Sequence, residues 1–160
     1  MDANTVAAEL AKPIAQELLG SAIPARLAYL GTDGDPRVVP VGFLWKDATV
    51  VIGAVPASAK VGALRKNPRV ALTIDTEGFP PRVLLIRGTA TVEVVDGVPD
   101  DYIAASRKLV PEAGFAEWEA GVRALFRQTA LITIVPDWAK VLDFETTVPK
   151  ALADLAADKQ

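Results

Sequence analysis

One short segment gathers the side chains that could hold an anion. Ser58 and Lys60 stand at the start of a predicted helix, inside a window from 48 to 74 that contains four basic residues and no acid. The four basic residues are Lys60, Arg65, Lys66 and Arg69. Because the whole chain has a net charge of -3, this local positive charge indicates a specific anion rather than a general polyanion surface. Ser58 is placed as a helix N-cap, and a helix N-terminus beside a lysine is suited to a phosphate.

The residue types that the chain lacks restrict its chemistry. Its 160 residues include no Cys and no His, one Met and two Tyr. Thiol nucleophiles, disulfides, Cys/His zinc sites and Ser-His-Asp triads are therefore excluded. Since few side chains remain that could act as general bases near neutral pH, a bound cofactor that carries the reaction would fit this composition.

The elements before the basic segment are predicted to be helical and then extended. An Ala- and Leu-rich helix is expected over 5–19, with a break at Pro13. Strands are predicted over Arg26–Thr32, Arg37–Trp45 and Thr49–Ala54. The turns between them are brief, which favours an antiparallel meander.

From Ser58 to the end of the chain, helices and strands are predicted in an order that has no regular repeat. Helices are predicted over 58–66, 99–110, 113–128 and 149–157, and strands over 70–75, 83–95, 131–135 and 139–144. Gly88 interrupts the clearest strand, which indicates a bulge or a close backbone approach. Asp100 and Asp101 suit the positive end of a helix.

The pattern as a whole predicts a mainly β protein with flanking helices. No strand-helix-strand alternation recurs, so an antiparallel sheet or barrel is favoured over a doubly wound sheet. One domain is expected over 1–160, with a helical N-terminus at 5–19, a barrel over about 25–149 and a short C-terminal helix. No apolar run approaches the roughly 18 residues of a membrane span, and the N-terminus does not have the pattern of a signal peptide, so a cytoplasmic protein is expected.

Four segments together carry a resemblance to a known family. They are Ala25–Leu30 with Gly34–Val41 (ARLAYL, GDPRVVPV), Ser58–Leu72 (SAKVGALRKNPRVAL), Ile86–Ala90 (IRGTA) and Ile134–Phe144 (IVPDWAKVLDF). Their order and spacing resemble the pyridoxamine 5'-phosphate oxidase-like family of FMN-binding split barrels, and the last segment is similar to actinobacterial members. The resemblance covers roughly 25–149.

The resemblance implies a homodimer of split β-barrels with a flavin in the cleft between the subunits. On matching positions, Ser58 and Lys60 would bind the cofactor phosphate. Arg65 either joins them or points to water. The other implied positions are Val39, Pro40 and Val41 along the isoalloxazine ring, Gly53 and Ala54 on the approach to the phosphate, and Trp138 from the partner subunit.

Several large or charged side chains outside this set have two possible roles. Trp118 and Trp138 are more typical of packing than of ligand binding, although Trp138 is also a candidate contact. Arg37 is expected to be a surface charge, with contact to the flavin or substrate as the alternative, and Arg69 is expected to be a strand-edge charge. Arg87 lies on the wet face of its strand, where it either holds an anionic cofactor tail or pairs with an acid across strands.

Two departures from the family pattern keep two functions open. Gly62 stands where members often have a basic residue, and the segment 128–131 lacks an arginine that many members carry. The first function is an oxidoreductase that uses FMN, or alternatively coenzyme F420, to pass hydride to a small organic acceptor. The second is a non-catalytic protein that binds a flavin, a haem-breakdown pigment or another planar anion. Nucleic-acid binding is disfavoured by the acidic total and by the lack of aromatics among the basic residues.

Overall fold

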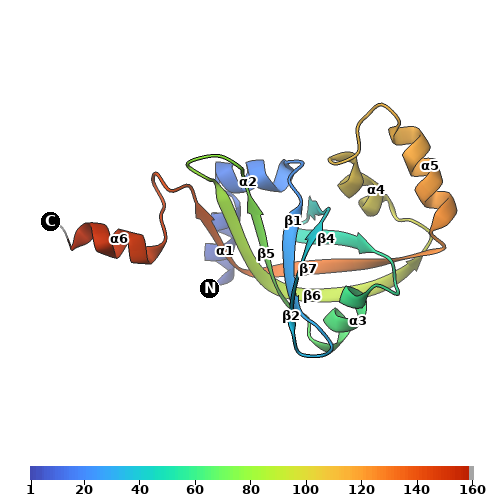
Figure 1. Ribbon diagram of the computed structural model, residues 1–160, viewed down its shortest axis with the longest axis horizontal. Helices are drawn as coiled ribbons and strands as arrows, with labels where there is room; N and C mark the ends of the chain where they lie inside the picture. The colour runs from blue at the N-terminus through green and yellow to red at the C-terminus, as the bar shows by residue number, and fades with distance from the viewer. Residues whose placement is uncertain (159–160) are drawn as a thin grey trace.

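The chain folds as one β-sheet with helices around it, as described by a computed structural model over residues 1–158. The described residues form α1 (Ala3–Leu10), α2 (Pro13–Gly20), β1 (Ala25–Leu30), β2 (Pro36–Val41), β3 (Leu44–Lys46), β4 (Thr49–Ala54), α3 (Ala59–Lys66), β5 (Arg69–Asp75), β6 (Val83–Asp96), α4 (Asp100–Arg107), α5 (Phe115–Leu125), β7 (Gln128–Leu142) and α6 (Lys150–Ala157). Figure 1 shows α1 and α2 at one side of the sheet, α4 and α5 at the other, and α6 apart from both.

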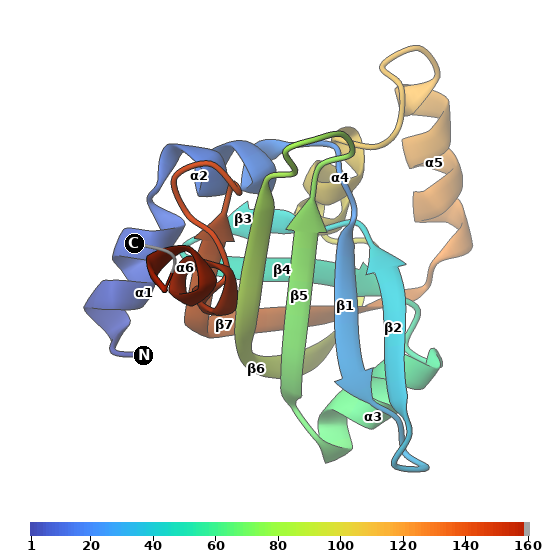
Figure 2. The ribbon, with the colours of Figure 1, turned by 60° about the vertical axis from the view of Figure 1, so that its left-hand side comes forward.

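The order of the strands shows how the sheet rolls up. The seven strands follow the order β2-β1-β5-β6-β7-β4-β3, and all neighbouring pairs are antiparallel. β2 and β3 therefore form the two opposite edges, although only Gly42 and Phe43 separate them along the chain. Because so short a link cannot span a flat seven-stranded sheet, the sheet must curl until its edges approach. The predicted antiparallel split barrel is confirmed (Figure 2).

The prediction of one strand over 37–45 was wrong. The chain breaks at Gly42 and Phe43, and β2 and β3 do not pair with each other as a meander requires. Phe43 is 1% exposed, so its ring turns into the barrel at this corner. Gly42 carries no side chain where the side chain of Leu109 lies against the backbone. The corner is thus fixed by core packing from distant residues, which the local pattern does not contain.

The prediction of two late strands at 131–135 and 139–144 was also wrong, since β7 is continuous. Gly88 pairs with Pro136 and Arg87 with Trp138, so Asp137 is the extra residue of a β-bulge. Pro136 lacks an N–H, and a bulge is one of the few places where a strand accepts proline. The close approach expected at Gly88 is confirmed, because a Cβ there would overlap the carbonyl of Val135.

The helices match the sequence prediction except at their ends. Pro13 divides the N-terminal helix as expected, and it begins α2. The helix predicted over 113–128 ends earlier, at Leu125, because Gln128 already pairs with Asp96 in the sheet. Sheet pairing overrides helix propensity at this boundary.

Two hydrophobic clusters hold these elements in place. The larger fills the barrel and includes Leu27, Ile52 and Ile132, each no more than 1% exposed. Burying a side chain of this size contributes about 1.5–3 kcal/mol. The smaller cluster, around Ile103 and Phe115, joins α4 to α5 and contains Trp118 as predicted. None of the described helices is long and apolar enough to cross a membrane.

Candidate functional site

The basic segment forms the connection from β4 to α3 and then α3 itself. The backbone N–H of Ser58 donates to the carbonyl of Val55 at 2.9 Å, which closes a turn directly before the helix. Ser58 has the extended backbone of an N-cap, with φ -67° and ψ 145°. The helix that follows packs against β1 and β6. The sequence therefore predicted the position of Ser58 correctly.

The side chain of Ser58 does not make the hydrogen bond that an N-cap normally makes. Its Oγ is buried and has no hydrogen-bond partner among the described residues. A buried hydroxyl without a partner costs about 1–3 kcal/mol. Native structures rarely tolerate such a group unless a ligand or water satisfies it. The start of α3 therefore has an unused hydrogen-bonding group beside its free backbone N–H groups.

Lys60 lies in the first turn of α3 and supplies a charge to the same place. The spacing of four residues puts Lys60 on the side of the helix that carries buried Leu64, and Lys60 itself is half-buried. No acid lies within ion-pair distance of its ammonium group in the described part of the chain. Its positive charge is therefore not neutralised by a neighbouring side chain.

Arg65 is set apart from Ser58 and Lys60. It is exposed and belongs to the last turn of α3, about 7.5 Å along the axis from Lys60. Gly62 lies on the same exposed side. Lys66 also points away, since its Nζ donates to the carbonyl of Thr32 at 3.3 Å. The start of the helix thus presents Ser58 and Lys60, and any contribution from Arg65 depends on its long side chain.

The predicted ring-binding segment is an edge strand. β2 pairs with β1 on one side and with no strand on the other, so backbone N–H and C=O groups are free along its outer edge. Val39 and Val41 turn toward the barrel core, whereas Pro40 is exposed. Free backbone groups are what the expected role of Val39, Pro40 and Val41 needs.

Of Gly53 and Ala54, expected on the approach to the phosphate, Ala54 is buried and Gly53 is half-buried. Ala54 is 8% exposed and belongs to the barrel core. Gly53 lies under the ring of Tyr102, where a Cβ would overlap that ring. Burial raises the pKa of Tyr102. The sequence analysis missed this contact, although a glycine inside a β-branched strand is a signal of close approach.

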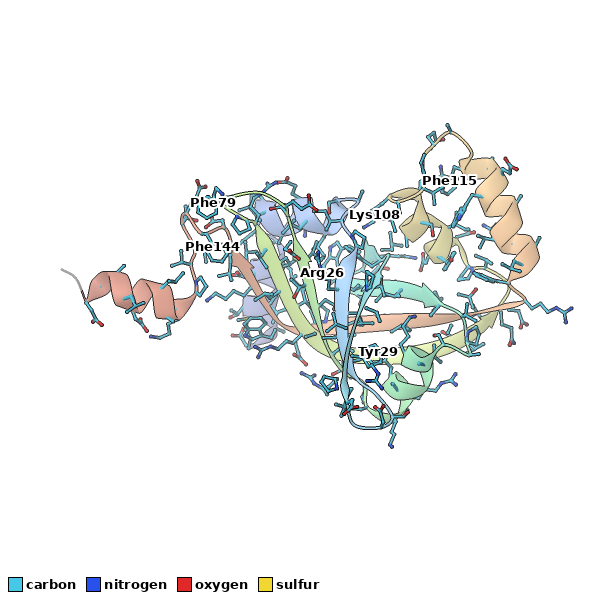
Figure 3. The ribbon with its side chains drawn as sticks, in the orientation of Figure 1. Arg26, Tyr29, Phe79, Lys108, Phe115 and Phe144 are labelled. Atoms are coloured by element: carbon cyan, nitrogen blue, oxygen red, sulfur yellow. The ribbon has the colours of Figure 1, made fainter. Side chains whose placement is uncertain are left out.

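Lys108 fixes the far end of α4 to the barrel and was also missed. Its Nζ lies 3.8 Å from the ring centroid of Phe43 and donates to the carbonyl of Leu19 at 3.2 Å. Burial lowers the pKa of Lys108 to about 8. Lys46 forms a further ion pair with Asp101 at 2.9 Å. Helix α4 is therefore fastened over β3 and β4, and Figure 3 shows Lys108 on that side of the molecule.

Trp138 is on the outer face of the sheet beside the bulge in β7. The guanidinium carbon of Arg87 lies 4.3 Å from the centroid of its ring, a cation-π contact. Arg69 forms an ion pair with Asp137 and donates to the hydroxyl of Thr89 at 2.8 Å. The hydrogen bonds that the Arg69 guanidinium donates to the carboxylate of Asp137 lower the pKa of Asp137. No hydrogen bond, ion pair or aromatic contact among residues 1–158 joins this cluster to Ser58 or Lys60.

A hollow on the same outer face was not predicted from the sequence. A cavity of about 540 Å³ opens there, and a second of about 360 Å³ continues it across three shared residues, Ala28, Val38 and Ala71. We call the two together the outer-face groove. Asp75 and Phe144 line one end of it and Arg69 and Arg87 the other, and Arg26 lines the first cavity. Arg26 and Phe144 are labelled in Figure 3.

The start of α3 fits the phosphate of a cofactor in its donors and in its charge. The buried Oγ of Ser58 lacks a partner, the ammonium of Lys60 lacks an acid, and the helix N-terminus carries partial positive charge. Gly62 has no side chain that could add a hydrogen-bond donor or a charge to these groups. No group of three or more potential metal-ligating side chains occurs among residues 1–158.

The antiparallel split barrel, with Ser58 and Lys60 at the start of α3, places the chain in a known class of folds. The chain belongs to the pyridoxamine 5'-phosphate oxidase family, whose model matches residues 11–139. The matched range includes the start of α3, the edge strand β2 and Trp138. No curated protein matches the chain.

Solved structures share the fold. An F420 reductase is 22% identical with a TM-score of 0.60, over 78% of this chain and 94% of that one. A conserved hypothetical protein from Mycobacterium tuberculosis is 16% identical with a TM-score of 0.60, over 91% and 86%. The heme storage protein of Vibrio cholerae is 16% identical with a TM-score of 0.59, over 82% and 93%. At these identities the likeness concerns the fold alone.

Proposed function

We propose that the protein is a cytoplasmic oxidoreductase that binds FMN, or alternatively coenzyme F420, with its phosphate at the start of α3. The observation that carries the proposal is the buried, unpartnered Oγ of Ser58 next to the uncompensated charge of Lys60. Charge-assisted hydrogen bonds of this kind are about twice as strong as neutral ones. The family and the fold of an F420 reductase support a flavin-like ligand.

The residues of the chain would bind and orient the cofactor rather than react. When bound, such a cofactor supplies hydride transfer to a small organic acceptor. Ser58 and the first N–H groups of α3 would donate to the phosphate, and Lys60 would neutralise it. The free edge of β2, at Val39, Pro40 and Val41, would offer backbone groups to the ring. A chain without His or Cys is suited to this division of roles.

The protein would act as a homodimer, with the ring in a cleft between subunits. Trp138 is on the outer face of the sheet, where it contacts Arg87, and it would reach the cofactor of the other subunit rather than its own. This is the arrangement that the family resemblance implies.

A second candidate is a binding protein of the same fold that does not turn over. The observation that favours it is the exposed Gly62, which leaves the phosphate site with one lysine. A heme storage protein shares the fold. However, the chain has no His or Cys to ligate haem iron, so a flavin or an iron-free pigment suits this candidate better.

Titration of the purified protein with FMN and with F420, followed by absorbance and fluorescence, tests the proposal. Saturable binding of one cofactor is expected, and failure of both to bind below about 1 mM, which corresponds to roughly -4 kcal/mol, would contradict it. Reoxidation of the bound, reduced cofactor by quinone-like acceptors then separates the two candidates, because only the enzyme accelerates it.

Lys60→Ala tests the phosphate assignment directly. Loss of a hydrogen bond to a charged group should weaken cofactor binding by roughly 1–3 kcal/mol. Lys66→Ala is the matched control, since Lys66 is on the same helix but is engaged with the carbonyl of Thr32. Equal dissociation constants for the Lys60→Ala variant and the parent protein would place the phosphate elsewhere.

A further inference from the structure

Helix α4 ends at a lysine that lines a small cavity. Lys108 is the C-cap of α4 and is labelled in Figure 3. A cavity of about 170 Å³ lies beside it, between the end of α2, β3 and the end of α4. The residues that line this cavity are Gln16, Leu19, Gly20, Leu44, Trp45 and Lys108. It shares no lining residue with the outer-face groove, and neither Ser58 nor Lys60 lines it.

The cavity beside Lys108 has apolar walls and is open to water on one side. Leu19 is buried, and Leu44 and Trp45 are half-buried. Gln16 and Gly20 are exposed, so a small molecule can enter on their side. A volume of 170 Å³ corresponds to roughly six water-sized groups at about 30 Å³ each. The cavity therefore has room for a short aliphatic molecule but not for a bulky cage or ring system.

Lys108 is the one lining residue of this cavity that can carry a charge, and it has no acidic partner. Its Nζ donates to the carbonyl of Leu19 at 3.2 Å and lies 3.8 Å from the ring centroid of Phe43. Lys108 forms no ion pair with any acid in residues 1–158. The charged residues of α2, β3 and α4 pair with one another or elsewhere, namely Glu17 with Arg82, Lys46 with Asp101, Asp100 with Arg123 and Arg107 with Glu112.

A half-buried lysine without an acid is a more available nucleophile than an exposed one. Only the free amine has the lone pair that attacks an electrophile, and burial favours that uncharged form. Burial lowers the pKa of Lys108 to about 8, so about a tenth of this side chain is free amine at pH 7. For a lysine with an ordinary pKa of about 10.4 the free fraction at pH 7 is about 0.04%.

We propose that Lys108 is a covalent capture site for short aliphatic aldehydes, which it holds as an imine in the cavity between α2, β3 and α4. The free amine attacks the carbonyl carbon, so that a C–N bond forms and the carbonyl oxygen becomes a hydroxyl. The two hydrogens of the amine leave with that oxygen as one water, and a C=N double bond remains. The step consumes no oxidant or reductant, and it is reversed by water.

The surroundings of Lys108 suit the protonated form of this imine. The protonated imine keeps one N–H, which can still donate to the carbonyl of Leu19. Leu19 belongs to the last turn of α2, where the helix dipole favours a positive charge, and the ring face of Phe43 favours a cation as well. The hydrocarbon chain of the aldehyde would lie against Leu44 and Trp45. None of these groups belongs to the start of α3, so the capture site stands or falls separately from the cofactor proposal.

Trapping with butanal tests the capture site in the full chain. Sodium cyanoborohydride reduces the imine to a stable amine, and peptide mass spectrometry then gives the extent of modification at each lysine. Lys66 is the internal comparison, since it also donates to a backbone carbonyl, that of Thr32, but is exposed. At neutral pH, modification of Lys108 at least tenfold faster than that of Lys66 is expected. Equal rates at the two lysines would overturn the proposal.

A bulky aldehyde and a pH series separate the cavity from the reactivity of the amine alone. With adamantane-1-carbaldehyde, the ratio of Lys108 to Lys66 modification should fall at least tenfold, because the cage does not fit beside Lys108. The same ratio with both aldehydes would show that the cavity does not receive the chain. The butanal rate at Lys108 should level off above about pH 8, whereas the rate at Lys66 keeps rising. Parallel pH profiles at the two lysines would contradict a free amine at Lys108.

Lys108→Arg is the matched variant. Arginine keeps the positive charge and can donate to the carbonyl of Leu19, so circular dichroism should show an unchanged fold. It forms no imine under these conditions, so most of the butanal adduct at neutral pH should disappear while Lys66 is modified as before. An undiminished total adduct in Lys108→Arg would overturn the assignment, whatever the cofactor titrations show.

Discussion

Helices α3 and α6 have eight residues each, but α3 lacks a partner for a polar group, whereas α6 lacks a partner for its apolar side. α3 buries Val61, Ala63 and Leu64 and keeps a buried hydroxyl, that of Ser58, without a hydrogen bond. α6 buries nothing, while the polar groups at its base are fully engaged by Asp143. A missing polar partner indicates a small anion, whereas a missing apolar partner indicates a protein surface. This difference is why the candidate cofactor site is placed at α3 and not at α6.

The largest expected difference between the two helices concerns their leucines. Leu64→Ala should lower the free energy of unfolding by roughly 2–5 kcal/mol, because Leu64 is 1% exposed and its removal leaves a cavity. Leu155→Ala should change it by no more than about 0.5 kcal/mol in dilute protein. Urea unfolding at low and high protein concentration measures both. An effect of Leu155→Ala that appears only at high concentration would sharpen the comparison, and a large effect in the monomer would break it.

Ser58→Ala separates a ligand-binding serine from an ordinary cap. Removal of a working N-cap costs about 1 kcal/mol, but Ser58 makes no cap hydrogen bond, so no loss of stability is expected. Binding of FMN or F420 should instead weaken by about 1–1.5 kcal/mol, roughly tenfold.

Asp2→Ala is the matched control for this variant. The carboxylate of Asp2 caps α1 by accepting from the backbone N–H of Thr5 at 3.0 Å, so its removal should cost about 1 kcal/mol of stability without affecting binding. A destabilised Ser58→Ala variant with unchanged affinity would reduce Ser58 to a structural residue.

Gly62→Lys tests whether the phosphate site is short of one charge. A Cβ at Gly62 meets no atom within 4 Å, so a side chain fits there. Both Gly62→Lys and its control Gly62→Ala should stabilise the helix by about 0.5–1 kcal/mol. Only the lysine should tighten cofactor binding, by about 0.2–1 kcal/mol for an exposed charge. Equal dissociation constants for the two variants would show that this position does not face the phosphate.

Asp143→Asn is expected to have the smallest effect, a local loss of stability in the turn that precedes α6. Hydrogen bonds from Thr146 and from backbone N–H groups hold the pKa of Asp143 well below its usual range. The stabilisation of the turn by the Asp143 carboxylate is therefore complete above the unfolded pKa of about 3.9, and it is lost progressively as pH falls from that value through the lower folded pKa. Amide hydrogen exchange at 145–147 should be faster in the variant above pH 4, and the difference should shrink toward pH 3. A difference that does not depend on pH would contradict this role for Asp143.

Local signals in the sequence were sufficient wherever one or two residues decide the backbone. Pro13 divides the first helix, Ser58 begins α3, and Gly88 lies at a close backbone approach, all as predicted. Each depends on a missing N–H, a capping position or a missing Cβ, which are properties of the residue itself.

Contacts between distant segments could not be predicted in the same way. The corner at Phe43 depends on core packing, and the cover over Gly53 depends on Tyr102, which arrives from α4. The missing hydrogen bond of the Ser58 hydroxyl is also visible only in the tertiary structure, since the sequence predicted that this hydroxyl would cap the helix.

The sequence by itself determined an antiparallel barrel, a family and a basic helix start at Ser58 and Lys60, because these depend on residue type and on spacing along the chain. Only the tertiary structure decided that β2 and β3 form opposite edges, that Arg87 covers Trp138 and that α6 stands clear of the barrel. These features depend on which segments far apart in the chain meet and which do not, and residue type and spacing along the chain do not determine that.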